Sequence, residues 1–279
     1  MGDEKQRVFV VTGGNRGIGN AVVRGIAKRA IDGVVYLTSR DARAGEEAVN
    51  AIKLDLASDL KADVRWTKLD IRDPESVQEL ATLLKTEHGG LDVLVNNAGI
   101  ACSEEEEDED ESEEAMARRR VEQAEMVLDV NYYGTKRVCD TLVPIIRPGG
   151  RIINVTGKYK SELTADLLSP QVTIEAIDNF VEDFKKLVRE EASGGDGFTF
   201  TAYRISKAAE LALTKALVRD LRPKQIKVNA CCPGFCATRL SGWEGPLDPS
   251  EGADTLVYLA VDADAPDGRF VFERKIIFW

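Results

Sequence analysis

Two residues that can together transfer a proton lie four positions apart in the C-terminal half of the chain, Tyr203 and Lys207. The apolar spacing over residues 203–221 predicts a helix, so both side chains project from one face. A phenol has an ordinary pKa of about 10, and a neighbouring ammonium stabilises the phenolate and lowers that pKa. We therefore expect Tyr203 to be a general acid that protonates a developing alkoxide, with Lys207 as its tuning partner. The alternative that this spacing leaves open is a pair on the helix surface without a function.

A glycine-rich loop covers residues 12–19, which read Thr-Gly-Gly-Asn-Arg-Gly-Ile-Gly. It follows a β-branched run at 7–12 that predicts a strand, and it precedes helical apolar spacing at 18–30. Glycines at such a junction let the backbone turn tightly and approach a pyrophosphate. The pyrophosphate then meets the N–H groups and the positive dipole end of the helix. This context favours nucleotide binding over a tight loop without a ligand.

The end of the second predicted strand indicates which nucleotide binds. NAD sites usually place a carboxylate about 20 residues after the glycines, where it binds the ribose 2′-hydroxyl. Here the strand ends in Thr38-Ser39-Arg40, and Arg16 lies inside the glycine loop. Two guanidinium groups suit a 2′-phosphate, because Arg can bind it in a bidentate manner. The residues therefore predict NADPH, and the alternative is that Arg40 only ends the strand at the surface.

Predicted strands and helices alternate along the whole chain. Continuous Val, Ile and Leu strands between helices are typical of a parallel sheet covered on both faces. We expect an α/β fold, a single doubly wound Rossmann domain over residues 1–279 with a mainly parallel seven-stranded sheet. The predicted strands are 7–12, 34–38, 64–69, 91–95, 151–155, 226–231 and 270–272, and the predicted helices are 18–30, 44–60, 74–87, one that ends near 143, 174–191, 203–221 and 250–260.

Two stretches interrupt the alternation, an acidic loop at 103–114 and a helical insertion at 158–201 before Tyr203. Within the insertion, residues 174–191 place seven apolar residues on one side of a predicted helix. The acidic loop holds ten acidic residues at the eleven positions 104–114, which accounts for nearly all of the net charge of −11. Such a tract is either a solvated loop held open by self-repulsion, or a surface that repels anionic substrates or recruits a basic partner.

The composition argues against several classes of protein. No apolar run approaches the roughly 20 residues that cross a bilayer, and the polar start at 1–7 is unlike a signal peptide. We therefore expect a cytoplasmic protein without a membrane partner. Five cysteines without a regular spacing suggest reduced thiols, and a single histidine, His88, predicts that there is no metal site. The charge distribution lacks the basic footprint of a protein that binds nucleic acid.

Several motifs occur in an order that is typical of one enzyme family. Besides the glycine loop they are Leu69-Asp70-Ile71, Asn96-Asn97-Ala98-Gly99, Asn131, Tyr203-x-x-x-Lys207 and Pro233-Gly234. Over essentially its whole length the chain resembles the short-chain dehydrogenase/reductases. More narrowly it resembles their monomeric cytosolic NADPH-dependent carbonyl reductases, on residues 12–19, 90–100, 180–183, 229–234 and the terminal Trp279.

The resemblance implies a reductase of small-molecule aldehydes, ketones and quinones that uses NADPH. It implies a monomer, because in that group the insertion covers the helices that other members use to dimerise. By the same resemblance, Lys207 would hold the ribose hydroxyls and Asn131 would hold a water that links Lys207 to solvent. The expected catalytic residues are Tyr203, Lys207 and Asn131, and the expected cofactor-binding residues are Gly13, Asn15, Arg16, Gly17, Ile18, Gly19, Arg40, Asp70, Ile71, Asn97, Ala98, Gly99, Tyr203, Lys207, Pro233, Gly234 and Thr238.

The chain departs from the family pattern at one catalytic position. The family places a serine three residues after the Asn of the fifth strand, here Asn154, and the chain has Gly157. Losing one such donor to the substrate oxygen costs about 10²–10³ in turnover. Three explanations stay open: Thr156 or Ser161 substitutes, a water substitutes, or the enzyme is slow or inactive. Strand alternation should point Thr156 to the face opposite position 157.

Gly157 keeps alternatives to an active reductase open. The first is an NADPH-binding protein with weak or no catalysis that acts as a sensor or an interaction module. A reductase dedicated to one biosynthetic ketone is a further hypothesis, and no feature of the sequence distinguishes it from the carbonyl reductase. Phe235 and Trp243 are expected either to line a substrate pocket, since aromatic walls suit planar carbonyls, or to pack in the core.

Overall fold

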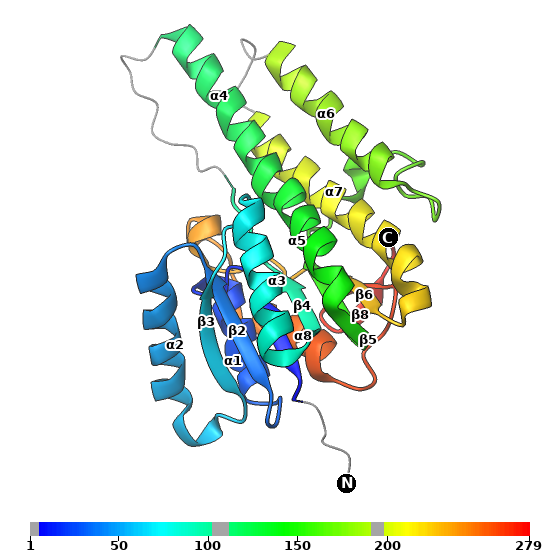
Figure 1. Cartoon of the computed structure of the whole chain (residues 1–279). Coiled ribbons are helices and arrows are strands. Elements are labelled where there is room, and N and C mark those ends of the chain that lie inside the picture. Colours follow the sequence, from blue (N-terminus) through cyan, green and yellow to red (C-terminus); the bar gives the residue numbers. More distant parts are fainter. Residues whose placement is uncertain (1–5, 102–111, 191–197) are drawn as a thin grey trace.

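The computed structural model describes residues 6–101, 112–190 and 198–279 (Figure 1). At its centre is one eight-stranded sheet in the order β3-β2-β1-β4-β5-β6-β7-β8. Neighbouring strands from β3 through β7 are parallel, and β8 pairs with β7 antiparallel. The strands are β1 Val8–Val11, β2 Val34–Ser39, β3 Asp63–Lys68, β4 Leu91–Asn96, β5 Ile146–Val155, β6 Lys227–Cys231, β7 Phe270–Phe272 and β8 Lys275–Ile277.

The predicted α/β class and mainly parallel sheet are confirmed, but the count of seven strands is wrong by one. The extra strand, β8, reverses from β7 through Glu273 and Arg274, whose φ angles are 49° and 57°. Two consecutive residues with positive φ form a tight hairpin turn that usually contains Gly or Asn. The turn is held from helix α8 (Pro249–Val261), where Thr255 Oγ1 accepts a 3.0 Å hydrogen bond from Arg274 N and Asp254 pairs with the Arg274 guanidinium. Because tertiary contacts hold it, the turn carries no local sequence signal.

Helices cover both faces of the sheet (Figure 1). On one face α1 (Gly17–Ala27), α2 (Ala42–Leu56) and α8 share a core with Phe9 and Val11 of β1. On the other face α3 (Pro74–His88), α4 (Glu113–Leu128), α5 (Thr135–Leu142) and α7 (Phe198–Leu221) share a core with Val8 and Val10. Successive side chains of β1 therefore point to opposite faces of the sheet and pack in the two cores. Within the described ranges, no helix has the length and apolar content needed to cross a membrane.

The insertion contains α6 (Ile174–Glu190), which packs against α4 and α7 (Figure 1). Its buried side chains, Ile177, Val181, Phe184 and Val188, fall on the side that the apolar spacing predicted. Helix α7 begins at Phe198, five residues before the predicted start.

The structure describes only the C-terminal end of the acidic stretch. Residues 103–111 lie outside the described residues. Helix α4 begins at Glu113, because Ser112 Oγ accepts a hydrogen bond from Ala115 N at 3.3 Å and caps the helix. Glu113 and Glu114, which we expected in a loop, therefore lie in the first helical turn, where the helix dipole favours negative charge.

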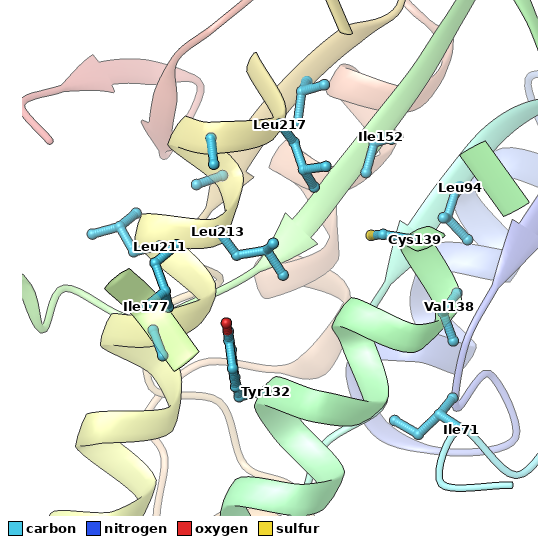
Figure 2. Close-up of a cluster of buried hydrophobic side chains, with 14 of the residues drawn as sticks. Ile71, Leu94, Tyr132, Val138, Cys139, Ile152, Ile177, Leu211, Leu213 and Leu217 are labelled. Atoms are coloured by element: carbon cyan, nitrogen blue, oxygen red, sulfur yellow. The ribbon is translucent and has the colours of Figure 1, made fainter. Parts of the chain in front are cut away.

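A π-helical turn, Asp129–Gly134, joins α4 to α5 and carries Asn131. The next residue, Tyr132, is fully buried, and Figure 2 shows its ring in the core beside side chains of α6 and α7 such as Ile177 and Leu211. Its hydroxyl donates to Asp178 Oδ1 of α6 at 2.7 Å, and Asp178 also pairs with Lys136 at 2.5 Å. The insertion helix thus holds the turn that positions Asn131.

Candidate active site

The sheet order fixes where a ligand can meet several strand ends. The strand order reverses between β1 and β4, which are neighbours in space but not in sequence. Parallel α/β sheets bind ligands in the crevice at such a point, outside the carboxyl ends of the strands. The segments that follow these ends are the glycine loop after β1, residues 97–100 after β4, residues 156–159 after β5 and residues 232–238 after β6. The glycine loop, Asn97-Ala98-Gly99 and Pro233-Gly234 therefore reach one edge of the sheet. The three predicted catalytic residues lie on helical segments instead, Asn131 on the π-helical turn and Tyr203 and Lys207 on α7.

The glycine loop is packed against the segment that follows β4. Thr12 Oγ1 accepts hydrogen bonds from Asn97 N and Ala98 N, both at 2.9 Å. The Asn97 side-chain amide donates to the carbonyls of Thr12 and Gly13, at 2.9 and 3.2 Å. A Cβ at Gly19 would lie 2.4 Å from Gly13 O and from Asn97 Nδ2, so no larger residue fits there. The Asn97 amide nitrogen therefore holds the glycine loop in its conformation and is not available to donate to a ligand.

The start of α1 presents unpaired donors. Its first helical residue is Gly17, with φ 55°, and Arg16 before it makes no side-chain cap. The first helical turn, which contains Ile18, has no acidic residue to neutralise the helix dipole. The Arg16 and Arg40 guanidinium groups are both exposed, and neither has a hydrogen bond or an ion pair with the described residues. Beside the loop, a hollow of about 460 Å³ is lined by Asn15, Arg16 and Gly17, among others.

The remaining predicted cofactor residues occupy different environments. Asp70 holds a turn, since its Oδ1 accepts from Arg72 N at 3.0 Å. Ile71 is 6% exposed and packs in the core beneath the π-helical turn, so its side chain is not available to a ligand. Thr238 reaches the glycine loop, because a Cβ at Gly17 would lie 3.4 Å from its Cγ2. Pro233 and Gly234 follow β6, and Gly234 has a φ of 82° that favours glycine.

Asn131 joins the segment after β4 to helix α7. It is fully buried, its Oδ1 accepts from Ile100 N at 2.8 Å, and its Nδ2 donates to Ile100 O and to Ser206 Oγ, both at 2.9 Å. Both amide donors are therefore used, and only Oδ1 has remaining capacity for the predicted water. A Cβ at Gly99 would lie 3.2 Å from Asn131 Oδ1 and 3.4 Å from Lys207 Nζ. The structure thus brings Gly99, Asn131 and Lys207 together, and a methyl group at position 99 would contact both side chains closely.

Lys207 is buried, and two acceptors lie against its ammonium, which has three donors. It is 5% exposed, its ammonium donates to Val155 O at 3.0 Å, and its Nζ lies 2.7 Å from Glu210 Oε2. The same Nζ is 6.0 Å from the centroid of the Tyr203 ring. The Tyr203 hydroxyl has no hydrogen-bond partner among the described residues. The acid pair predicted from the sequence is therefore a phenol with a free hydroxyl beside an ammonium that already has two acceptors.

The expected effect of this ammonium on Tyr203 is wrong for the protein without a ligand. Burial raises the pKa of Tyr203 above its ordinary value, and Tyr159, Glu210 and Cys232 act in the same direction. Burial disfavours the charged phenolate, and the Glu210 carboxylate offsets the ammonium that would stabilise it. Sequence spacing placed Lys207 correctly but could not show that a buried carboxylate neutralises it.

The place of the missing serine side chain is occupied by an aromatic ring. A Cβ at Gly157 would lie 2.4 Å from Cε2 and 2.5 Å from Cδ2 of Tyr159. Tyr159 also contacts Tyr203 edge to face, with ring centroids 6.1 Å apart, and the Arg204 guanidinium lies 5.7 Å from its centroid. Gly157 is therefore a steric requirement of the Tyr159 ring.

Neither hydroxyl proposed to replace the serine is well placed. Thr156 Oγ1 is enclosed, and it has no hydrogen-bond partner in the described part of the chain. A substrate oxygen cannot reach an enclosed atom without rearrangement. Ser161 is exposed in the short helix Lys160–Glu162. Core packing is wrong for the two aromatic candidates, since Phe235 is 54% and Trp243 69% exposed.

Two residues of this site were missed in the sequence. Tyr159 follows the fifth strand by four residues, and the only signal for it in the sequence was the absence of a side chain at Gly157. Glu210 continues the helical spacing of Tyr203 and Lys207 at 203, 207 and 210, which places all three on one face of α7. That spacing was a usable signal, since a glutamate on the buried stripe of a helix needs a partner.

Comparison with known proteins decides the family. The sequence model of the short chain dehydrogenase family matches residues 7–165 and 191–245. The chain belongs to this family. Carbonyl reductase 1 (NADPH) of Homo sapiens is 35% identical over 291 residues, which cover 98% of each chain. The salutaridine reductase of Papaver somniferum superposes with a TM-score of 0.80 at 31% identity, over 95% of this chain and 99% of the other. Menthone neomenthol reductase of Mentha piperita has a TM-score of 0.73 at 29% identity, over 97% and 99%.

The packing of Tyr159 on Gly157 predicts a strong coupling in this short-chain dehydrogenase. Gly157→Ala should lower the free energy of unfolding by about 1–3 kcal/mol, because the new methyl overlaps the Tyr159 ring. In a Tyr159→Ala background the same change should cost less than about 1 kcal/mol, since the overlap is gone. Urea unfolding of the four proteins of this cycle measures both values. Equal costs in the two backgrounds would contradict the steric account.

Proposed function

We propose that this short-chain dehydrogenase is an NADPH-dependent carbonyl reductase, which reduces aldehydes, ketones and quinones to alcohols. The observation that carries the proposal is the meeting of Gly99, Asn131 and Lys207 next to Tyr203, whose hydroxyl makes no hydrogen bond to a described residue. The relatives named as carbonyl reductases align over nearly their whole length and support the same chemistry.

The residues at the glycine loop fit NADPH. The uncapped start of α1 suits a pyrophosphate, and Gly13 and Gly17 have φ angles of 64° and 55° that let the backbone approach it. Exposed Arg16 and Arg40, without partners among the described residues, suit the 2′-phosphate. Lys207 and Tyr203 would hold the ribose and nicotinamide end, together with Ala98, Gly99, Pro233, Gly234 and Thr238. When bound, NADPH would supply the hydride for the carbonyl carbon.

The protein's own residues would supply the proton. Tyr203 would donate its hydroxyl proton to the oxygen of the former carbonyl, as the negative charge develops there. The Lys207 ammonium would stabilise the phenolate that remains, and Asn131 would keep Lys207 and Ser206 in register through α7. Tyr159, beside Tyr203, would form an aromatic wall on the substrate side.

The site also bears on the alternative of a sensor without catalysis. Gly157 was its main support, and Tyr159 now accounts for that glycine on steric grounds. The closeness of Tyr203, Lys207 and Asn131 also supports an active enzyme, and the named relatives are reductases. We therefore do not favour the sensor.

We further propose that the protein forms a single domain and acts as a cytoplasmic monomer, without nucleic-acid or membrane partners. The packing of α6 against α4 and α7 supports the monomer, because it covers helices that the family otherwise uses for dimerisation. Light scattering after size exclusion would measure the state directly.

Removal of the Tyr203 hydroxyl tests the proposed reaction. Tyr203→Phe should lower kcat by about 10²–10⁴ with little change in NADPH affinity, because the proton donor is lost and the ring stays. The measurement is NADPH oxidation across a panel of aldehydes, ketones and quinones. Tyr258→Phe on α8, on the opposite side of the sheet, is the matched control and should keep its activity. Tight NADPH binding without turnover by the wild-type protein would favour the sensor instead.

Arg40 is expected to determine the preference for NADPH. Arg40→Ala should raise KM for NADPH by about 10–100-fold, since a charge-assisted contact with a phosphate is worth about 1.5–3 kcal/mol. KM for NADH, which lacks that phosphate, should stay nearly the same. Arg43→Ala is the control, because Arg43 lies nearby on α2 but pairs with Glu47 at 2.8 Å. An equal rise for both cofactors would contradict the assignment of the 2′-phosphate to Arg40.

A further inference from the structure

Glu210 is a buried carboxylate in the active site that the proposed reaction does not use. It is 1% exposed, and its Oε1 accepts a hydrogen bond from Thr135 Oγ1 of α5 at 3.2 Å. Its Oε2 lies 2.7 Å from Lys207 Nζ and has no other partner in the described part of the chain. A carboxylate this deep requires a compensating charge, and here that charge is the catalytic ammonium.

The geometry of α7 puts the carboxylate on the same face as the acid. Tyr203, Lys207 and Glu210 are spaced by four and three residues, so they follow one another along one side of the helix. Lys207 is held on its other side by Val155 O of β5 at 3.0 Å. The ammonium is therefore fixed between two acceptors, and the Glu210 carboxylate offsets part of the effect of its charge on Tyr203.

We propose that Glu210 is a positioning residue that fixes the Lys207 ammonium and keeps Tyr203 protonated to a higher pH than the ammonium alone would allow. The inference rests on the proposed function, because it concerns the proton that Tyr203 donates. In reduction the Tyr203 O–H bond breaks, and its proton goes to the alkoxide formed when hydride reaches the carbonyl carbon. Only protonated Tyr203 can take this step, so Glu210 sets the alkaline limit of reduction.

The charged groups around Glu210 determine the direction of the effect. Along α7 these are Lys207 and Tyr203, and from α5 the thiol of Cys139, whose pKa burial raises to about 12, so that it stays neutral. Burial raises the pKa of Glu210 to about 6, although Lys207 and Thr135 act in the opposite direction. Above this pH the carboxylate is ionised and opposes a phenolate at Tyr203. Below it the carboxyl is neutral, and the ammonium lowers the pKa of Tyr203 without opposition.

The test is the pH dependence of kcat/KM for carbonyl reduction in Glu210→Gln. This variant keeps the shape of the side chain but removes its charge, so the alkaline limb should move to lower pH by about one unit. Onset of alcohol oxidation with NADP⁺, which requires the phenolate, should move in the same direction. Asp220→Asn removes a carboxylate from the same helix at an exposed position and should leave both limbs unchanged.

The acidic range gives a second signature. The ratio of wild-type to Glu210→Gln activity should change with an apparent pKa near 6, because protonated Glu210 resembles glutamine. The cofactor 2′-phosphate also titrates at about pH 6. It is common to both proteins and cancels in the ratio. A ratio that is constant through this range would overturn the proposal.

An unmoved alkaline limb, or one that moves to higher pH, in a folded Glu210→Gln protein would also overturn it. If that variant does not fold, Thr135→Val removes the donor to Glu210 Oε1. The transition near pH 6 should then move upward, and an unmoved transition would contradict the proposal.

A spectroscopic measurement separates this inference from the proposed function. Tyrosinate absorbance, taken as the difference from the Tyr203→Phe protein, follows the Tyr203 proton without turnover. Its midpoint should fall by about one pH unit in Glu210→Gln. Absence of turnover in the wild-type protein would count against the reductase, whereas an unchanged midpoint would count against Glu210.

Discussion

The Lys207 ammonium is only 5% exposed, and a charge removed so far from water must be compensated by the protein around it. Val155 O at the end of β5 and the Glu210 carboxylate on α7 provide this compensation. The hydrogen bond from Lys207 to Val155 O ties α7, the longest helix of the described chain, to β5 at the centre of the sheet, and the ion pair with Glu210 lies within α7 itself. Together the two contacts hold the ammonium near Tyr203, with Nζ 6.0 Å from the centroid of its ring, where the proposed reaction needs it.

The rest of the site is built around this fixed point by close packing. Gly99 lies against both Lys207 and Asn131, and a Cβ there would be 3.2 Å from Asn131 Oδ1 and 3.4 Å from Lys207 Nζ. Asn131 is in turn carried by a π-helical turn that Tyr132 and Asp178 attach to α6. The insertion thus has a role beyond covering a surface, since a buried hydroxyl and a carboxylate link it to the turn that carries Asn131. Loss of that link would leave a buried phenol unpaired, which is costly.

The sequence predicted the parts of this arrangement that follow from local pattern. The β-branched runs, the glycine loop and the spacing of Tyr203 and Lys207 placed the strands, the loop and the acid pair, and α6 lies within one residue of its predicted range. The final strand was missed because its turn at Glu273 and Arg274 contains no glycine and is stabilised by contacts with α8. The direction of the Tyr203 pKa was missed for a related reason, because it depends first on burial of the phenol and then on Tyr159 and Glu210, and these surroundings exist only after α7 is packed. Tyr159 was missed because its ring fills the space of the absent serine side chain from a position two residues further along the chain.

Isotopic transfer is the most direct measurement of the central claim, that this site delivers hydride and proton to one carbonyl. NADPH deuterated at the nicotinamide C4, on each face in turn, would be incubated with the protein and a ketone in ordinary water. The account predicts an alcohol with one deuterium on the carbinol carbon from one of the two labelled forms, and almost no product from Tyr203→Phe. An alcohol without deuterium from either form, or equal yields with and without the Tyr203 hydroxyl, would contradict it.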